Sequence, residues 1–325
     1  MKNIFITGGA GYVGSVLTPA LLSKNYNVTV YDLFIYGDTL EKHKNLKTIK
    51  GDLRNTTLLE ESLKNQDQVI HLACISNDPS FELNPSLGKE INLDAFEPLV
   101  SLSKQSGVNR FVYASSSSVY GIKTEKDVHE DMSLDPLTDY SKFKADCEKI
   151  LFKYTSDNFV TSVIRPATVC GYSPRQRLDL VINILTNLAY HKKEISVFGG
   201  SQLRPNIHIK DMVRAYELFI EIDPNKINGK IFNVGFENKT VNELALSVKS
   251  VIGDDVKINT LPTDDNRSYH VSSQKIFREL GFEAKFTIED AVIDLKNAFD
   301  NKLLKNTLDN IDYFNIKKMQ NLKLS

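Results

Sequence analysis

A glycine-rich turn near the start of the chain constrains the fold more than any other feature. The sequence TGGAGYVG places Gly8, Gly11 and Gly14 directly after an apolar run, Asn3–Thr7, and directly before a helical pattern, Ser15–Lys24. Glycine permits a tight turn at the first position, close approach of a pyrophosphate at the second, and packing of helix on strand at the third. Free N–H groups at the start of the helix would hold the phosphates. The turn therefore predicts a dinucleotide site.

An acidic residue follows at the distance that such a site requires. Asp32 ends the expected strand Asn27–Tyr31, about 20 residues after the glycines, where a carboxylate accepts hydrogen bonds from the adenosine ribose. It would repel a 2'-phosphate, and Asp32–Tyr36 contains no Arg or Lys to receive one. This pattern predicts NAD as the cofactor rather than NADP. The alternative is that the glycines are ordinary turn residues and that Asp32 is a solvated loop acid.

Other residues are expected around the same cofactor. Asp52, in GDLR after the expected strand Leu46–Lys50, is placed to reach the adenine edge, although Gly-Asp is also ordinary turn chemistry. The remaining predicted cofactor contacts are Tyr12, Val13, Leu53, Leu72 and Ala73.

Short apolar runs and helical patterns alternate through the first half of the chain. Nearly continuous apolar runs are typical of parallel strands covered on both faces. The alternation predicts an α/β fold with a doubly wound parallel sheet, the Rossmann arrangement. The further expected strands are Gln68–Leu72, Arg110–Ala114 and Thr161–Arg165, and the further helices are Thr57–Lys64, Leu87–Gly107 and Ser141–Thr155.

The regular alternation of expected strands and helices ends after Pro166, and this change predicts a second, smaller α/β lobe. We expect a cofactor-binding domain over residues 1–165 and a region over 166–325 that mainly binds substrate and is interleaved with the first. Its expected helices are Leu178–His191, Lys210–Ile222, Val241–Val251 and Ile288–Phe299, and its strand is Lys230–Val234. The polar segment 305–325 is weakly patterned and is given no function.

The composition is that of an ordinary globular protein. The 325 residues include 41% hydrophobic and 25% charged side chains, with a formal net charge of −1. No global charge favours nucleic acid or an anionic membrane, and no run reaches the ~20 apolar residues that span a bilayer. Three widely spaced cysteines form neither a metal-ligand pattern nor a disulfide framework. Because the chain opens directly into a strand pattern, we expect no signal peptide, no bound metal and a cytoplasmic location.

A second constellation carries the expected chemistry. Hydroxyl side chains cluster after the expected strand Arg110–Ala114, in SSSSVYG, and Tyr140 and Lys144 follow at i, i+4 spacing on one helix face. A free tyrosine has a pKa near 10, which a neighbouring ammonium and a positive nicotinamide ring would lower. Tyr140 is thus the expected base, Lys144 its electrostatic partner and a ribose ligand, and Ser116 the clamp on the substrate oxygen. Taken alone, the Tyr-Lys pair is common in ordinary helices.

Together these pieces resemble the extended short-chain dehydrogenase/reductases, in particular the NAD-dependent epimerases and dehydratases of nucleotide sugars. The resemblance covers nearly the whole chain and includes TGGAGYVG, Asp32, GDLR, HLAC at 71–74, SSSSVYG, YSKFK, Arg165-Pro166, RPNIHIKD at 204–211 and RSYHVSSQKIFRELGF at 267–282.

The resemblance implies a nucleotide-diphosphate sugar as substrate. In the positions that match the family, Asn92 helps to shape the active site, and Arg204 and Arg267 bind the substrate diphosphate, for which bidentate guanidinium groups are suited. The further substrate contacts implied are Ser116, Ser117 and Thr168. The resemblance also implies a homodimer that packs the helix carrying Tyr140 and the helix before it against the same pair in a second subunit.

Departures from the family pattern bear on the reaction. Dehydratases carry Asp-Glu directly after the catalytic hydroxyl residue, where this chain has Ser117 and Ser118, so a 4,6-dehydratase is disfavoured. We expect a 4-epimerase similar to UDP-glucose 4-epimerase, which oxidises C4 transiently and reduces it again. Thr168, where such epimerases usually show Asn, leaves open a one-way 4-dehydrogenase or ketoreductase. A non-catalytic NAD-binding protein is the remaining alternative.

Overall fold

The central element of the computed structural model is a seven-stranded sheet in the order β10-β6-β5-β4-β1-β2-β3. The structure describes residues 2–76, 78–263, 268 and 270–322. All neighbouring strands of this sheet run parallel. The strands are β1 (Asn3–Thr7), β2 (Asn27–Asp32), β3 (Leu46–Lys50), β4 (Gln68–His71), β5 (Arg110–Ala114), β6 (Val160–Pro166) and β10 (Lys230–Val234). The expected doubly wound α/β fold is confirmed.

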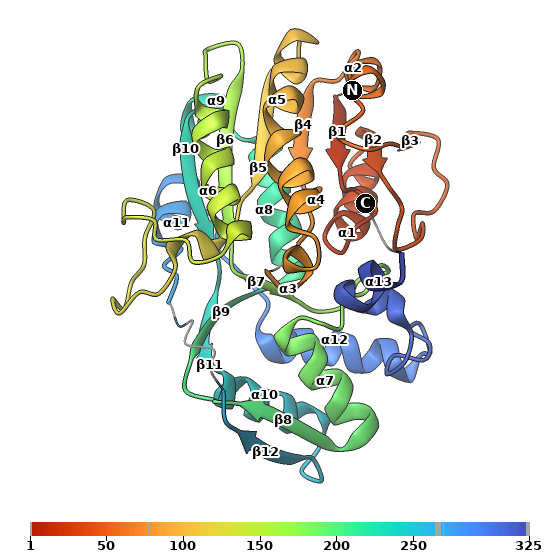
Figure 1. Ribbon diagram of the computed structural model, residues 1–325, viewed down its shortest axis with the longest axis vertical. Coiled ribbons are helices and arrows are strands. Elements are labelled where there is room, and N and C mark those ends of the chain that lie inside the picture. Colours follow the sequence, from red (N-terminus) through yellow and green to blue (C-terminus); the bar gives the residue numbers. More distant parts are fainter. Residues whose placement is uncertain (1, 77, 264–267, 269, 323–325) are drawn as a thin grey trace.

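Helices cover both faces of this sheet (Figure 1). One face packs on α1 (Gly14–Ser23), α8 (Ile209–Glu221) and α11 (Gln274–Leu280), and the other on α2 (Thr56–Leu63), α5 (Phe96–Gln105) and α6 (Asp139–Phe152). Alternate strand residues supply the two cores: Ile4 and Ile6 belong to the first, and Phe5 belongs to the second. Burial on both faces explains why inner strands such as β1 and β4 read as nearly continuous apolar runs, whereas the edge strand β3 is largely exposed.

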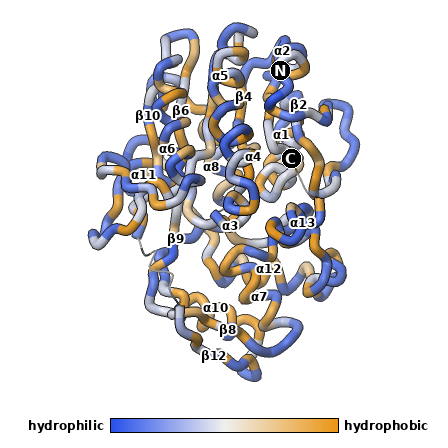
Figure 2. The backbone as a smooth tube through the Cα atoms, in the orientation of Figure 1, coloured by the Kyte–Doolittle hydropathy of each residue, from blue (hydrophilic) through white to orange (hydrophobic). Residues whose placement is uncertain are grey.

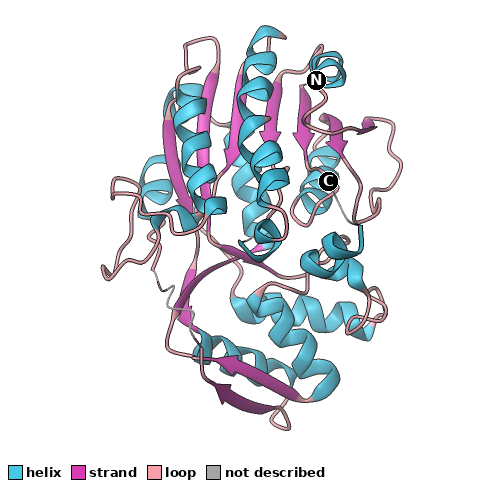
Figure 3. Ribbon diagram, in the orientation of Figure 1, coloured by secondary structure: helices cyan, strands magenta, loops and turns pink. Residues whose placement is uncertain are grey.

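A smaller lobe lies below the carboxyl ends of the central strands (Figures 1 and 3). It contains a three-stranded sheet of β7 (Thr168–Cys170), β9 (Leu203–His208) and β11 (Glu237–Thr240), and a two-stranded sheet of β8 (Glu194–Phe198) and β12 (Lys257–Leu261). Its helices α7 (Val181–Lys192), α10 (Val241–Ile252) and α12 (Ile288–Asp300) pack on one another. The chain crosses more than once between the central sheet and the smaller lobe. Helix α8 packs on the central sheet and β10 pairs within it, although both follow lobe strands in the sequence.

The long helix expected over Leu87–Gly107 is wrong in its continuity. The structure has α4 (Pro85–Lys89), a π-helical turn (Glu90–Asp94) and then α5. Pro98 explains the interruption, because its ring clashes with the carbonyl four residues earlier in a regular helix and it has no N–H to donate. Short helices not expected from the sequence are α3 (Asp78–Glu82), α9 (Pro224–Ile227), α11 and α13 (Asn315–Leu322), with 3₁₀ turns at Ser117–Tyr120 and Ile311–Tyr313.

Capping side chains set the start of several helices. Thr138 begins α6 with a reciprocal capping box to Ser141, and Thr240 with Glu243 does the same for α10.

In Figure 2 the central strands are largely hydrophobic, whereas outer loops such as the one between β2 and β3 are mainly hydrophilic. In the described part of the chain, none of the helices has the length and apolarity to cross a bilayer.

Candidate active site

A deep pocket lies at the carboxyl ends of β1, β2, β4, β5 and β6. Its volume of about 420 Å³ falls within the range of small-molecule and cofactor sites, about 300–1,000 Å³. Parallel α/β sheets place their ligands at this edge. The structure brings most of the predicted site residues together here: Gly8, Gly11, Tyr12, Val13, Gly14, Asp32, Asp52, Leu53, Leu72, Ala73, Ser116, Ser117, Tyr140, Lys144 and Thr168.

The glycine-rich turn between β1 and α1 forms one wall. Gly8 has φ +73°, a left-handed conformation that favours glycine, and a Cβ there would lie 2.6 Å from the main-chain nitrogen of Ala73. A Cβ on Gly14 would lie 2.5 Å from the carbonyl oxygen of Gly8. A side chain at Gly8 would clash with the segment after β4, and one at Gly14 would push α1 away from the turn. The turn therefore presents main-chain atoms and the N-terminal end of α1 to the pocket, as a pyrophosphate requires.

Asp32 lies beside this turn at the end of β2. Its carboxylate accepts hydrogen bonds from the main-chain N–H groups of Ala10 at 3.0 Å and Phe34 at 2.8 Å. Burial raises the pKa of Asp32, while these N–H groups and the charge of Arg175 act against that rise. Each carboxylate oxygen has a second lone pair for a ribose hydroxyl.

The expected adenine end contains Asp52 and Leu53. The carboxylate of Asp52 is paired with Arg54, with its Oδ2 2.8 Å from a guanidinium nitrogen, and this pairing lowers the pKa of Asp52. The main-chain carbonyl of Asp52 accepts a hydrogen bond from the Tyr31 hydroxyl at 2.7 Å. The side chain of Asp52 is thus already held in place at the pocket edge.

The three expected catalytic residues meet at the other end of the pocket. Ser116 follows β5 and caps the 3₁₀ turn, where its Oγ accepts hydrogen bonds from Ser118. Tyr140 lies in the first turn of α6. One turn further on, Lys144 is buried and donates from Nζ to the carbonyl of Ala114 at 2.7 Å. The side chain of Tyr140 lines the same pocket as the hydroxyl cluster Ser116–Ser118, and the Ser116 hydroxyl acts on its pKa.

The electrostatic setting of Tyr140 is specific. Burial holds the pKa of its phenol well above the usual range, and Asp78 acts in the same direction. The positive charge of Arg177 and the nearby Ser116 hydroxyl favour the phenolate. The phenol is therefore protonated at neutral pH until more positive charge enters the pocket. An oxidised nicotinamide is such a charge, so the residues present fit an NAD cofactor.

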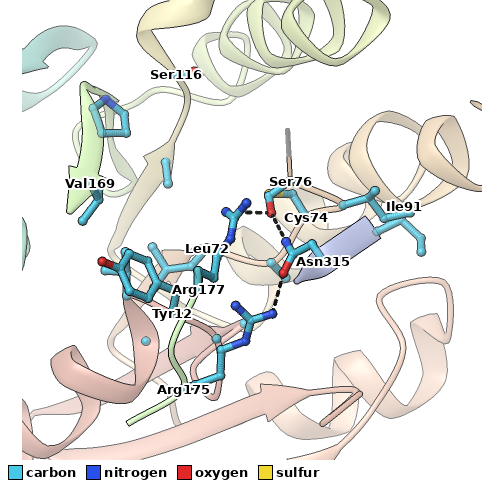
Figure 4. Close-up of a pocket in the computed structure, with 18 of the residues that line it drawn as sticks. Tyr12, Leu72, Cys74, Ser76, Ile91, Ser116, Val169, Arg175, Arg177 and Asn315 are labelled. Carbon is cyan, nitrogen blue, oxygen red and sulfur yellow. Dashed lines mark hydrogen bonds between the residues drawn. The ribbon is translucent and has the colours of Figure 1, made fainter. Parts of the chain in front are cut away.

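Two arginines that were not predicted as site residues line the same pocket. Arg175 and Arg177 come from the segment between β7 and α7 and are 4% and 9% exposed. Figure 4 shows a chain of hydrogen bonds from Arg177 through Ser76 and Asn315 to Arg175. Asn315 and Met319 belong to α13, in the segment for which no function was expected. Their sequence context carries no signal, because only the tertiary fold brings them to the pocket.

Two predicted substrate residues, Asn92 and Arg204, are not among the described residues that line the pocket. The amide of Asn92 exchanges hydrogen bonds with the main chain of Ile75 at 2.8 and 2.9 Å, so it holds the loop after β4. Arg204 lies on β9 in the smaller lobe, where a guanidinium nitrogen donates to the carbonyl of Leu203 at 3.0 Å. Arg267 lies outside the described residues.

Comparison with known proteins identifies the class. The model of the NAD dependent epimerase/dehydratase family matches residues 4–235, more than half of the chain. UDP-glucose 4-epimerase of Lactobacillus helveticus is 26% identical over 90% of this chain and 94% of its own length. The chain therefore belongs to the NAD-dependent epimerase/dehydratase family, and NAD is its cofactor.

Solved structures agree with this assignment. UDP-glucose 4-epimerase of Thermotoga maritima with UDP-glucose has a TM-score of 0.85 and 26% identity, covering 93% of this chain and 100% of that one. MoeE5 in complex with UDP-glucuronic acid and NAD has a TM-score of 0.81 and 27% identity, covering 92% and 99%. The same general fold thus accommodates both the dinucleotide and a nucleotide sugar.

Proposed function

We propose that this protein is a nucleotide-sugar 4-epimerase that oxidises C4 of the sugar to a ketone and reduces it again on the opposite face. The observation that carries the proposal is the meeting of Tyr140, Ser116 and Lys144 at one end of the cofactor pocket. When bound, NAD supplies the hydride acceptor and returns the hydride.

The residues of the chain divide the remaining work. Tyr140 takes the proton of the C4 hydroxyl as the carbon loses hydride, and returns it after the ketone has turned over. Ser116 donates a hydrogen bond to the same oxygen as it gains carbonyl character. Arg177 and Lys144 supply fixed positive charge that favours the Tyr140 phenolate at the moment of proton transfer. Ser117 and Thr168 line the space in which the sugar ring turns.

The cofactor is held by groups at the other end. The N-terminal turn of α1 faces the pyrophosphate, and Asp32 accepts hydrogen bonds from the adenosine ribose. Tyr12, Val13, Leu53, Leu72 and Ala73 supply apolar and main-chain contacts. Asp52, already paired with Arg54, is placed near the adenine.

One feature supports epimerisation over dehydration. Elimination of water needs an acid and a base beside the catalytic hydroxyl, and Ser117 and Ser118 provide neither. Similarity extends over nearly the full length of the chain both to UDP-glucose 4-epimerases and to 4,6-dehydratases, so it is this side-chain chemistry that favours the epimerase. Asn92 shapes the site by holding the loop after β4, and Arg204 and Arg267 bind the substrate diphosphate in this proposal.

The experiment is a substrate panel. Purified protein with NAD is incubated with UDP-, GDP-, CDP- and dTDP-sugars, and the products are separated and analysed by NMR at C4. We expect C4-inverted product from at least one sugar, with no net change in NADH absorbance at steady state. A sustained change in absorbance would indicate instead a one-way 4-dehydrogenase or ketoreductase. Binding without any conversion across the panel would refute both enzymatic proposals.

The proposal includes the assembly and its place in the cell. We infer a homodimer in which α5 and α6 pack against the same helices of a second subunit, and a cytoplasmic location where nucleotide sugars are available. Light scattering of the full chain tests the first, because a mass of one subunit at micromolar concentration would contradict it.

A further inference from the structure

Arg175 is a buried cation that makes no ion-pair contact with a carboxylate among the described residues, although the charges of Asp32 and Asp179 act on it from a distance. One guanidinium nitrogen donates to the Asn315 side-chain oxygen at 2.6 Å, and the guanidinium stacks on the Tyr36 ring, 3.7 Å from its centroid. Among the described residues, its Nε and Nη1 have no hydrogen-bond partner and no carboxylate lies in ion-pair contact. Leaving a buried charge in this state is unfavourable. Because Arg175 also lines the pocket, its free N–H groups are placed to receive an anionic ligand.

The main chain fixes this guanidinium next to the phosphate-binding turn. The N–H of Arg175 donates to Ser15 Oγ at 3.3 Å, and Ser173 Oγ donates to the carbonyl of Tyr12 at 2.7 Å. Ser173 and Ser15 also share a hydrogen bond at 2.8 Å. The segment before α7 is thus tied to the first turn of α1, so Arg175 and the helix N-terminus face one pocket.

Arg177 is different, although it is close in the sequence. Its Nε donates to Asp179 at 2.9 Å, so a carboxylate compensates its charge, and another nitrogen donates to Ser76 Oγ at 3.2 Å. Burial and the neighbouring Arg177 lower the pKa of Arg175 to about 10, so it remains positively charged at neutral pH. Of the two, Arg175 is the cation without an ion-pair contact among the described residues.

Asn315 holds this arrangement together from α13. Its main-chain N–H donates to Asp179 at 3.0 Å, and its side-chain nitrogen donates to Ser76 Oγ at 2.9 Å. Its one remaining side-chain acceptor therefore faces Arg175, as Figure 4 shows. An amide orients the guanidinium without neutralising it, which a carboxylate would do.

We propose that Arg175 binds the pyrophosphate of the dinucleotide opposite the glycine-rich turn, and that Asn315 is the positioning residue that orients its guanidinium. A bidentate guanidinium matches phosphate oxygens in geometry and charge. This inference concerns only the cofactor and does not depend on which reaction the enzyme performs.

The test compares ligand fragments by calorimetry on full-length protein freed of nucleotide. The probes are adenosine, which lacks phosphate, and ADP-ribose, which contains the pyrophosphate. We expect Arg175→Gln to weaken ADP-ribose roughly 10- to 100-fold and to leave adenosine within about twofold. Arg110→Gln is the matched control, because Arg110 is equally buried but donates to Phe219 and Ile222 at the opposite end of β5. It should change neither affinity.

Asn315→Asp separates positioning from a merely structural role. The new carboxylate keeps the guanidinium in place but neutralises it, so ADP-ribose binding should weaken roughly tenfold while the melting temperature of the free protein does not fall. Equal losses for adenosine and ADP-ribose in the Arg175 variant, or no loss for either, would overturn the proposal. So would a greater loss for NADP than for NAD, which would place the group at the ribose. If Arg175→Gln does not fold, Arg175→Lys and Asn315→Asp decide by the same criteria.

Discussion

The ammonium of Lys144 donates a hydrogen bond to the carbonyl oxygen of Ala114 at 2.7 Å, which ties α6 to the end of β5. Its nitrogen lies 5.9 Å from the centroid of the Tyr140 ring. This tie holds the residue pair at the point where the central strands meet the cofactor pocket. The expected proton-transfer residue is therefore mounted on rigid elements rather than on a loop.

Replacing Tyr140 by Phe tests its role as the base. The ring and its packing are kept while the proton acceptor is removed, so turnover should fall roughly 10²- to 10⁴-fold. NAD affinity, measured by calorimetry, should stay within about twofold because the pyrophosphate and ribose contacts lie elsewhere. Turnover near that of the wild type would show that another group takes the proton.

Replacing Arg177 by Gln should move the pH dependence of activity. Burial raises the pKa of Tyr140 and the charge of Arg177 opposes that rise, so loss of the charge raises the pKa further. Activity needs the phenolate, and the acid limb of kcat/KM should therefore shift toward higher pH. Arg177→Lys keeps the charge and is the control, and its limb should lie near that of the wild type. An unchanged limb in Arg177→Gln would remove Arg177 from the electrostatics of the base.

Replacing Asp32 by Ala should weaken NAD chiefly at the adenosine ribose. Two or more hydrogen bonds are lost, which corresponds to roughly 10- to 100-fold in Kd. Adenine alone should bind as it does to the wild type, which provides an internal control. Undiminished NAD affinity would mean that the carboxylate only accepts from Ala10 and Phe34.

His71 makes the stability of the protein depend on pH. It is buried, it shares a hydrogen bond with Thr7 at 2.6 Å, and burial with the nearby Lys144 charge lowers its pKa to about 3. As the pH falls below about 6.5, His71 becomes protonated in the unfolded chain but stays neutral in the folded protein. Stability should then decline by up to about 1.4 kcal/mol per pH unit from this group, until the pH reaches the folded pKa.

Denaturant titrations between pH 7 and 4 measure this effect. His71→Asn keeps a polar group near Thr7 but cannot titrate, so its stability curve should be flatter than that of the wild type over this range. Parallel curves for the two proteins would show that the imidazole is accessible to protons when folded.

Local patterns were sufficient for the elements that dominate the central sheet. Strands β1, β3, β5 and β10 have the predicted bounds, because each is a short β-rich run flanked by polar or turn residues. Gly8, Gly11, Gly14 and Asp32 could also be predicted from the sequence, since their expected roles depend on short-range spacing after a strand. Tyr140 and Lys144 share one helix face for the same reason.

Other elements depend on tertiary structure. Strand β9 lies between β7 and β11 although it contains Pro205, which cannot donate to a ladder and argues against an inner strand. The π-helical turn that carries Asn92 replaces part of a continuous helical pattern. Arg175 and Asn315 reach the pocket only when distant segments meet, and neither has a sequence motif. These residues illustrate why the cofactor turn was predictable and its opposite wall was not.

The contribution of α13 to the pocket has a consequence for the whole chain. Met319 and Asn315 line the same pocket as the turn before α1. A bound nucleotide would therefore contact both the N-terminal and the C-terminal parts of the chain and link them non-covalently. Its stabilising effect grows with the logarithm of its free concentration. We therefore expect limited proteolysis to cut at α13 sooner in the nucleotide-free protein than in protein saturated with the dinucleotide.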